Sequence, residues 1–439
     1  MNNHRLLAGA LAVSLLGAGA CAYGRSDNVY TLEQLFEIAE TNSALLRPSF
    51  TAREEARRQI AIARNDLLPE IEASLSLSYI GNGFTTRRDF SGFSKAPIPH
   101  LGTGLSLKVT QPLYTGGAVS AKIDIAELKS TAATYDMEAR RDDIRMQIAA
   151  DYLDIYECAN LRDVVDSNVA RARRMLSDMR LRYEQGVALL NDITRYELLV
   201  ADLELQLVKL DNTMRILNSN LTAAAGLPEG SVVSPDTTIL QRSLPGVPED
   251  WWQSEARDNS APLSVARSVV DISRRAEDLV RAERRPKVGL SAGWSIDGPI
   301  LVEVPPINRN LSYWYVGVGV SYNISSLYKS DRSLARSRVA TRHAEEEYDA
   351  ALVDLHTGVR AAYIKYLEAY EELKTQRKSV ELAERNYNVV ATRYSEGMAL
   401  ITDLLDAASS SLDAARRLVN ARVDIIYCYY RLLYITGKI

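Results

Sequence analysis

The sequence contains few cysteines and few histidines, and their spacing excludes the common metal and disulfide frameworks. Its three cysteines, Cys21, Cys158 and Cys428, form no C-x-x-C pair and are too few for a disulfide scaffold. Its four histidines show no H-E-x-x-H or comparable ligand spacing. We therefore predict no metal site and no cofactor. Because Cys158 and Cys428 lie on apolar helical faces, we expect both to be small buried thiols.

The chain also lacks a strong charge of either sign. Its net charge is only −4, and lysines and arginines are scattered along its 439 residues instead of forming a basic patch. Proteins that bind nucleic acid usually carry such a patch, so we predict no nucleic-acid partner.

Catalytic motifs are equally scarce. Gly289–Gly293 spells G-x-S-x-G, but a nucleophile elbow requires a strand-to-helix turn, and this segment lies within an alternating strand. Gly102 and Gly104 lack the third glycine of a phosphate-cradling loop. We therefore predict that the protein is not an enzyme.

The N-terminus has the order of a secretory signal. The positive residue Arg5 is followed by an apolar run at Leu6–Leu16 and then by the small residues Ala18–Ala20. We therefore predict that residues 1–20 are a signal peptide. Cys21 follows at once, as the lipid-accepting cysteine of a bacterial lipoprotein does, and both acylation and plain cleavage remain open. Beyond this point no run of about 18 apolar residues exists, so we predict no membrane-spanning helix in the mature chain.

A long internal repeat organises the rest of the chain. The stretch Arg182–Asp192 (RYEQGVALLND) returns 211 residues later as Arg393–Asp403 (RYSEGMALITD). Upstream, Pro69–Gly81 is echoed by Pro286–Gly298, 217 residues later. A repeat of this length indicates two copies of one large structural unit.

The repeat divides the chain into three further parts. We predict a first repeat at 21–226, an equatorial connector between the repeats at 227–261, and a second repeat at 262–439. The connector carries several prolines and the pair Trp251 and Trp252, and we expect it to pack against the outside of the helical body.

Four segments of about ten residues alternate between apolar and small or polar residues, which is the period of a β-strand. Aromatic residues lie near their ends. Such strands are typical of a transmembrane barrel wall and exceed the usual five or six residues of soluble strands. A soluble half-buried sheet is the alternative. The four segments are 70–80, 101–111, 287–296 and 313–322.

Very long helices are predicted between the strand pairs. Neither glycine nor proline occurs in 118–185 or 187–225, and only Gly358 interrupts 324–396. At 1.5 Å per residue the longest helix would reach about 100 Å. Apolar residues from Ile193 to Leu221 recur at steps of three and four, which is coiled-coil spacing.

Four strands cannot close a barrel by themselves. An open sheet edge in lipid would leave backbone groups without hydrogen-bond partners, and the smallest outer-membrane barrels need about eight strands. Several copies of the chain must therefore pool their strands, and the residue pattern alone allows either two or three copies.

The sequence resembles the TolC-like outer-membrane efflux channel family, also called outer membrane factors. The resemblance is carried by the signal, the repeated strand–strand–helix–turn–helix order, Gln111–Gly117 (QPLYTGG) at the first strand-to-helix junction, and R-Y-x-x-G-x-A-x-x-x-D at both helix turns. The second junction, Asn323–Tyr328, departs from the family pattern. The resemblance implies an α+β membrane protein with two tandem repeats. Three copies would form a 12-strand β-barrel in the cell outer membrane and an α-helical periplasmic tunnel.

The resemblance also implies a function. The protein would be the outer-membrane exit duct of a tripartite efflux system, passively conducting substrates from an inner-membrane pump and a periplasmic adaptor protein to the exterior. Its partners would be two further copies of itself, that adaptor, that pump and outer-membrane lipid. The alternatives are the exit channel of a type I protein-secretion system and, in a different class, a periplasmic coiled-coil scaffold without a pore.

The two helix turns are predicted at Gly186 and Gly397, since glycine adopts a positive φ at no steric cost. Apolar residues follow each turn, and we expect them to be exposed and to contact a partner. In the resembled family that partner is the hairpin end of the adaptor; a contact within the trimer is the alternative. These residues are Val187, Leu189, Leu190, Met398, Leu400 and Ile401.

The candidate residues of the periplasmic entrance are Asp192, Tyr394, Asp403, Asp406 and Arg195, the repeat counterpart of Asp406. By resemblance, Asp403 and Asp406 match an acidic ring, while Asp192 and Tyr394 match positions that help to hold the entrance closed. The family's basic residue two places after the glycine is Ala399 here. Like charges brought together in a ring raise each other's pKa and attract cations.

Overall fold

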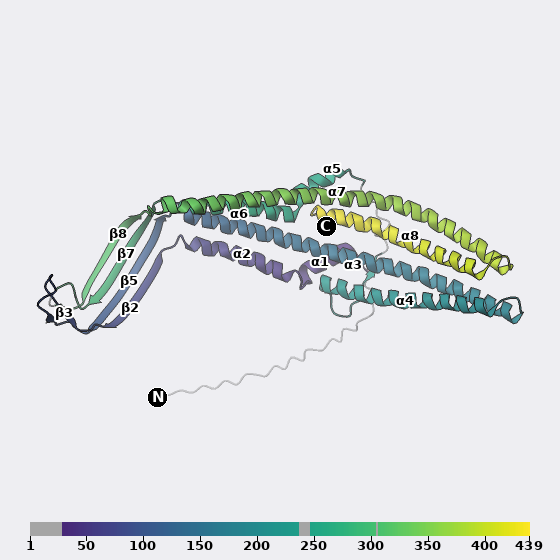
Figure 1. Ribbon diagram of the computed structural model, residues 1–439, viewed down its shortest axis with the longest axis horizontal. Coiled ribbons are helices and arrows are strands. Elements are labelled where there is room, and N and C mark those ends of the chain that lie inside the picture. Colours follow the sequence, from purple (N-terminus) through teal and green to yellow (C-terminus); the bar gives the residue numbers. More distant parts are fainter. Residues whose placement is uncertain (1–28, 237–245, 304–305) are drawn as a thin grey trace, which may run out of the picture.

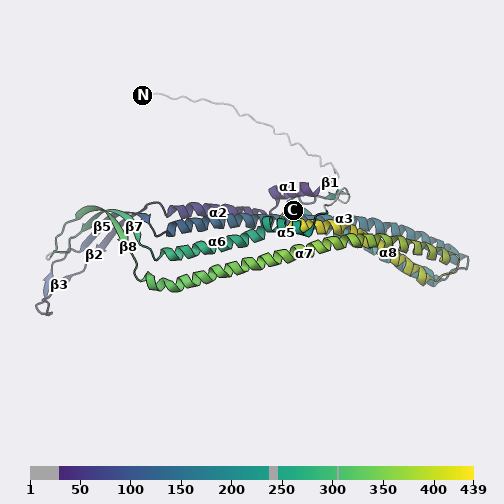
Figure 2. The same ribbon diagram turned by 90° about the horizontal axis from the view of Figure 1, so that it is seen from above.

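The computed structural model describes residues 29–236, 246–303 and 306–439. The molecule is elongated, with a β-sheet at one end and long helices running away from it to two turns at the other (Figures 1 and 2). The predicted signal peptide and Cys21 lie outside the described residues.

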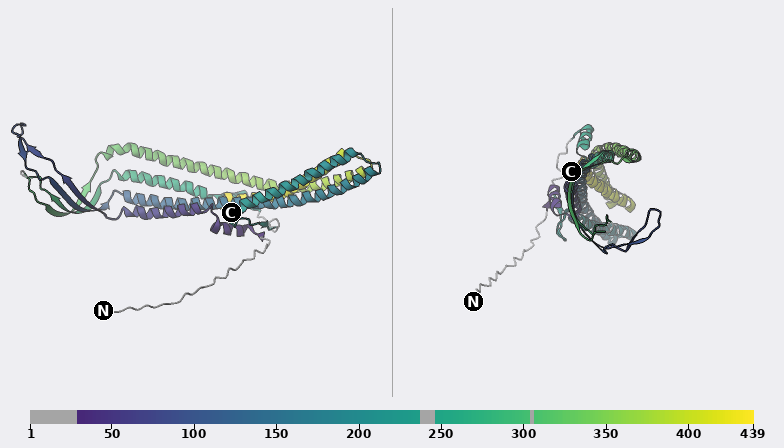
Figure 3. Two further views of the ribbon diagram at one scale, coloured as in Figure 1. Left: turned by 90° about the horizontal axis from the view of Figure 1, so that it is seen from below. Right: turned by 90° about the vertical axis from the view of Figure 1, so that its left-hand side faces the viewer.

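One four-stranded antiparallel sheet contains all four predicted long strands, in the order β2-β5-β7-β8. Its strands are β2 (Glu70–Tyr79), β5 (Leu101–Tyr114), β7 (Lys287–Gly298) and β8 (Leu311–Ser321). Seen from its end, the sheet is a curved wall (Figure 3). Among the described strands, the outer edges of β2 and β8 have no partner, so this wall is incomplete in one chain.

The register of the sheet gives it two different faces, as the sequence pattern predicts. One face carries the aligned row Ile71, Val109, Ala292 and Val316. The neighbouring row, Glu72, Lys108, Gly293 and Tyr315, points to the other face. One face of the wall is therefore apolar and suited to lipid, whereas the other carries mostly small or polar side chains.

Two helical hairpins form the body of the molecule. The first joins α3 (Ala118–Glu184) to α4 (Leu190–Ala225), and the second joins α7 (Ser326–Ser395) to α8 (Ile401–Ile435). With 67 and 70 residues, α3 and α7 confirm the predicted long helices. No helix in the described ranges combines the length and the hydropathy needed to cross a membrane.

On the side near the sheet, a shorter helix lies beside each long helix. The helix α2 (Arg47–Asn65) lies beside α3 and roughly end to end with α4, and α6 (Ala261–Ala282) lies beside α7 and roughly end to end with α8 (Figures 1 and 2). Residues 44–46 form a turn before α2, and Pro48 lies in the first turn of this helix.

The middle of the molecule carries small additional elements. The helix α1 (Leu32–Asn42) begins with a capping box, in which the Gln34 N–H donates to Thr31 Oγ1 (3.2 Å) and the Thr31 N–H donates to Gln34 Oε1 (3.0 Å). The other elements there are β1 (Val29–Tyr30), its parallel partner β6 (Ser234–Pro235), and α5 (Glu249–Asn259), which packs on α7.

The two thiols within the described ranges are partly buried. Cys158 lies on α3, and Cys428 lies on α8 beside the apolar cluster around Trp252. Burial raises the pKa of each thiol to about 11, so both stay protonated at neutral pH. The prediction of buried thiols is therefore too strong, because each side chain retains some exposure.

We expect Trp252→Ala to destabilise the helical body far more than Trp251→Ala. The Trp252 side chain is 1% exposed and packs among α7 and α8, so its removal should cost about 3–5 kcal/mol of folding free energy. Trp251 is partly exposed, with the Lys438 ammonium 5.0 Å from its ring centroid, a contact worth about 0.5–1 kcal/mol. Thermal melts followed by circular dichroism would measure both, and equal midpoints for the two variants would contradict the prediction.

Candidate periplasmic entrance

Both helix turns reverse at a glycine in the left-handed conformation. The φ angle is 76° at Gly186 and 74° at Gly397. A Cβ at either position would meet no atom within 4 Å, so the backbone angle, and not lack of space, requires glycine here. The turns close in the same way, since the Val187 N–H donates to the Arg182 carbonyl (3.0 Å) and the Met398 N–H donates to the Arg393 carbonyl (2.8 Å).

Five of the six predicted tip residues are strongly exposed. Their exposed fractions range from 59% at Leu190 to 73% at Val187, with Leu189, Met398 and Leu400 between these values.

The sixth residue, Ile401, is buried, and the prediction of its exposure was wrong. Its side chain is only 7% exposed. It is the first residue of α8 and belongs to the same apolar cluster as Leu404, one turn further along the helix. The phase of α8 therefore turns Ile401 inward while Leu400 stays outside.

A hydrogen bond joins the two helical hairpins next to the turns. The Tyr394 hydroxyl on α7 donates to Oδ2 of Asp192 in the first turn of α4, at 3.4 Å. Burial, and then the negative charge of Asp192, raises the pKa of Tyr394 to about 12. The phenol therefore remains a neutral donor at physiological pH. The structure thus brings these two predicted residues together.

A second link between the hairpins was missed by the sequence reasoning. The Arg182 guanidinium at the end of α3 donates to the backbone carbonyl of Ser395 at the end of α7. Its positive charge also lies near enough to Tyr394 to act on the pKa of that phenol. Arg182 opens the repeated R-Y-x-x-G motif, and that was the available signal. It supplies a cation beside the predicted entrance, where Ala399 stands two places after Gly397.

The two acidic-ring candidates lie one turn apart on α8. Asp403 and Asp406 are both exposed, and Oδ2 of Asp403 accepts the Leu400 N–H at 3.1 Å, which caps the start of the helix. Arg195 is exposed on α4. One chain supplies only one pair of these carboxylates, so the ring itself remains a prediction that depends on symmetry-related copies.

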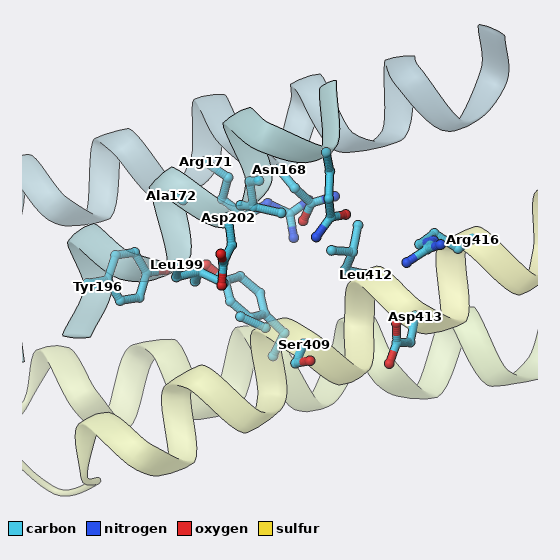
Figure 4. A pocket seen from close by; sticks show the side chains of 14 residues that line it. Asn168, Arg171, Ala172, Tyr196, Leu199, Asp202, Ser409, Leu412, Asp413 and Arg416 are labelled. Atoms are coloured by element: carbon cyan, nitrogen blue, oxygen red, sulfur yellow. The ribbon is translucent and has the colours of Figure 1, made fainter. Parts of the chain in front are cut away.

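Further from the turns, a cavity of about 180 Å³ lies between the hairpins (Figure 4). Polar side chains of α3 and α4 face Asp413 and Arg416 of α8 across it. The Arg171 guanidinium lies 5.0 Å from the ring centroid of Tyr387, at the edge of this cavity. The hollow interrupts the apolar packing between the two hairpins. In the described parts of the chain, no group of His, Cys, Asp and Glu side chains is arranged to hold a metal ion.

Comparison with known protein families decides the identity of this architecture. A family model described as outer membrane efflux protein matches residues 35–227 and 252–438. The chain belongs to this family. Its two matched stretches correspond to the two halves of the internal repeat.

Individual relatives match over nearly the whole chain. It is 22% identical over 426 residues to the outer membrane protein TolC of Vibrio cholerae, covering 93% of this chain and 91% of that protein. It is also 22% identical over 445 residues to the proteases secretion protein PrtF of Dickeya chrysanthemi, covering 98% and 91%. Its fold is similar to that of the outer membrane protein VceC from Vibrio cholerae, with a TM-score of 0.76, 17% identity and coverage of 92% and 96%.

These matches confirm the predicted fold class, the tunnel-plus-barrel fold of trimeric channels built from tandem repeats. This outer membrane efflux protein lies in the outer membrane, and its helices form a periplasmic tunnel. It is an exit duct, and its family consists of channel proteins that are not enzymes.

The raised pKa of Tyr394 predicts a titration that can be observed directly. A tyrosine with a raised pKa keeps its proton up to a higher pH. The hydrogen bond to Asp192 is therefore fully formed below pH 10 and is lost as the pH rises through about 12. Subtracting the phenolate absorbance of Tyr394→Phe from that of the unaltered channel should isolate one tyrosine per chain with a pKa near 12. A difference curve centred at pH 10 would show that Tyr394 is solvated.

Proposed function

We propose that this outer membrane efflux protein is the passive exit duct of a tripartite system, receiving substrates from an inner-membrane pump through a periplasmic adaptor. The observation that carries the proposal is the apolar tip, formed by Val187, Leu189, Leu190, Met398 and Leu400. Large apolar side chains exposed together on a helical turn are typical of a contact surface for another protein.

The geometry of the tip supports a helical partner. Each chain offers two similar turns, closed by the same backbone hydrogen bonds, so three copies offer six such turns. Apolar side chains after each turn suit an adaptor whose own helical hairpin inserts its apolar residues beside them. In this arrangement the adaptor contacts both repeats, and its binding can act on the links between the hairpins.

The unpaired edges of the sheet support the assembly that the duct requires. The strands β2 and β8 have 10 and 11 residues, so β8 of one copy can pair with β2 of the next along its length. Pairing at every such edge leaves no open edge in the membrane. The small and polar face of the sheet then lines the lumen, which suits a duct that relies on its pump for selection.

The test replaces two tip residues and follows export. Leu189→Asp with Leu400→Asp should abolish export of a pump substrate, measured as tolerance in cells that lack other exit channels, while the trimer still reaches the outer membrane. The matched control is Val302→Asp, because Val302 is equally apolar and 94% exposed but lies at the opposite end of the molecule. Normal export by the tip variant would contradict docking at the tip.

A second candidate, the exit channel of a type I protein-secretion system, is favoured by the relative named for protease secretion, which is as similar to this chain as TolC is. Co-expression with a drug pump and adaptor, or with a secretion ATPase and its adaptor, would distinguish the two. Drug tolerance without release of a protein substrate supports the efflux proposal, and the reverse result supports secretion.

A further inference from the structure

A small β-hairpin projects from the sheet at the end opposite the helices. It consists of β3 (Gly83–Thr85) and β4 (Ser94–Ala96), which pair with each other in antiparallel fashion. In the chain order both strands lie between β2 and β5. Figures 1 and 3 show it at the far end of the molecule. Because the helices lie in the periplasm, this hairpin lies at the exterior surface of the outer membrane.

The hairpin concentrates the phenylalanines of the protein. The whole sequence has only five, and three of them, Phe84, Phe90 and Phe93, lie here with exposed fractions of 69–79%. The rings of Phe84 and Phe93 lie together, with centroids 5.6 Å apart. Phe84 is directly opposite Lys95 in the β3–β4 register, so an aromatic and a cationic side chain share one face of the hairpin. No described side chain covers this face.

The same hairpin carries cations without acidic partners. Arg87, Arg88 and Lys95 make no ion pair among the described residues, whereas arginines on the helices commonly do, as Arg173 does with Glu204 (2.7 Å). The sole acid between residues 80 and 100 is Asp89, whose carboxylate accepts the N–H (3.1 Å) and the hydroxyl (2.7 Å) of Ser91. This segment is therefore positive, with three cations and one anion, in a chain whose net charge is −4.

We propose that this hairpin is a binding site for the phosphorylated headgroups of outer-leaflet lipid. Arg87, Arg88 and Lys95 hold the phosphates, while the three phenylalanines enter the boundary between headgroups and acyl chains. Exposed aromatic side chains next to basic ones are the pattern of a segment that lies in a membrane interface. An arginine fork binds phosphate through two parallel, charge-assisted hydrogen bonds.

The position of the hairpin supports a lipid occupant. It leaves the sheet just beyond Tyr79, whose ring stacks on His100 with centroids 5.3 Å apart. Aromatic residues at strand ends mark the level of the lipid headgroups in outer-membrane proteins. The hairpin thus lies beyond the outer end of the sheet, at the level of the headgroup layer, where the phosphates lie.

The experiment measures binding of lipid A, which carries two phosphates, to the purified trimer in detergent without divalent cations, which would compete for the phosphates. The variant Arg87→Gln, Arg88→Gln, Lys95→Gln should bind at least tenfold more weakly, and so should Phe84→Ser, Phe90→Ser, Phe93→Ser. Lipid A stripped of its phosphates should bind the unaltered trimer about as weakly as lipid A binds the charge variant.

The matched control removes three cations from the periplasmic helices. Arg57, Arg174 and Arg257 are exposed and make no ion pair among the described residues, so changing them to Gln alters the total charge equally and should leave lipid A affinity unchanged.

Three outcomes would overturn the proposal. Unchanged affinity of the charge variant would remove the role of the cations. If the trimers of the charge variant dissociated while lipid binding stayed unchanged, the hairpin would instead contact a neighbouring copy, at the loop that carries Val302 and Glu303. A higher conductance with unchanged lipid binding would make it a lid over the pore. The assay uses neither pump nor adaptor, so its result is independent of the proposed export function.

Discussion

The variant Arg182→Ala with Tyr394→Phe is expected to open the periplasmic entrance. These two side chains make the side-chain links between the hairpins beside the turns, one to Ser395 and one to Asp192. Each link contributes about 1 kcal/mol, since hydrogen bonds in partly exposed positions have modest net values. Two links in each of three copies then total about 6 kcal/mol, and if the subunits open together the ratio of closed to open channels falls about 10⁴-fold.

Single-channel recordings in planar lipid bilayers measure this change as a higher conductance and a longer open time. In cells, large antibiotics that the outer membrane normally excludes should enter. The matched control is Arg180→Ala, because Arg180 lies two residues away on α3 but pairs with Glu197 (2.7 Å) inside the first hairpin. A closed double variant, or an equally open control, would show that these links do not hold the entrance.

The variant Asp403→Asn with Asp406→Asn is expected to abolish most of the cation selectivity of the channel. Six carboxylates from three copies would surround one narrow opening, and a field of this kind concentrates cations about tenfold or more. Replacing Asp with Asn instead of Ala keeps an acceptor for the Leu400 N–H, so the start of α8 stays capped. The ratio of cation to anion permeability should therefore fall about tenfold, and block by multivalent cations should weaken.

Reversal potentials in a salt gradient give this permeability ratio. The control is Glu184→Gln with Glu396→Gln, which removes as many carboxylates at the helix turns but outside the proposed ring; both residues are exposed. The ring is refuted if the control lowers the selectivity as much as the variant does, or if the variant conducts with unchanged selectivity.

Local sequence signals predicted local structure well. The absence of glycine and proline predicted α3, and single glycines predicted the helix turns at Gly186 and Gly397. The two-residue alternation predicted four strands, and the register of the sheet confirmed that their apolar positions share a face. These features depend on neighbours within a few residues, so the sequence carries them directly.

The tip shows where such reasoning ends. Ile401 was expected to be exposed because it follows a turn, yet the phase of α8 directs it into the apolar cluster. Arg182 was overlooked because its partner, the carbonyl of Ser395, is a backbone group that has no signature in the sequence. Both outcomes depend on how the two hairpins lie against each other.

By itself the sequence determined the two repeats, the lengths of the helices and strands, and the glycines at the turns, because helix and strand periodicity and positive φ are properties of short segments. Only the tertiary structure decided which side chains link the hairpins and which apolar residues remain uncovered. The physical reason is that these contacts join residues about 200 positions apart, such as Asp192 and Tyr394, separated by 202 positions. Their meeting is set by the packing of whole helices.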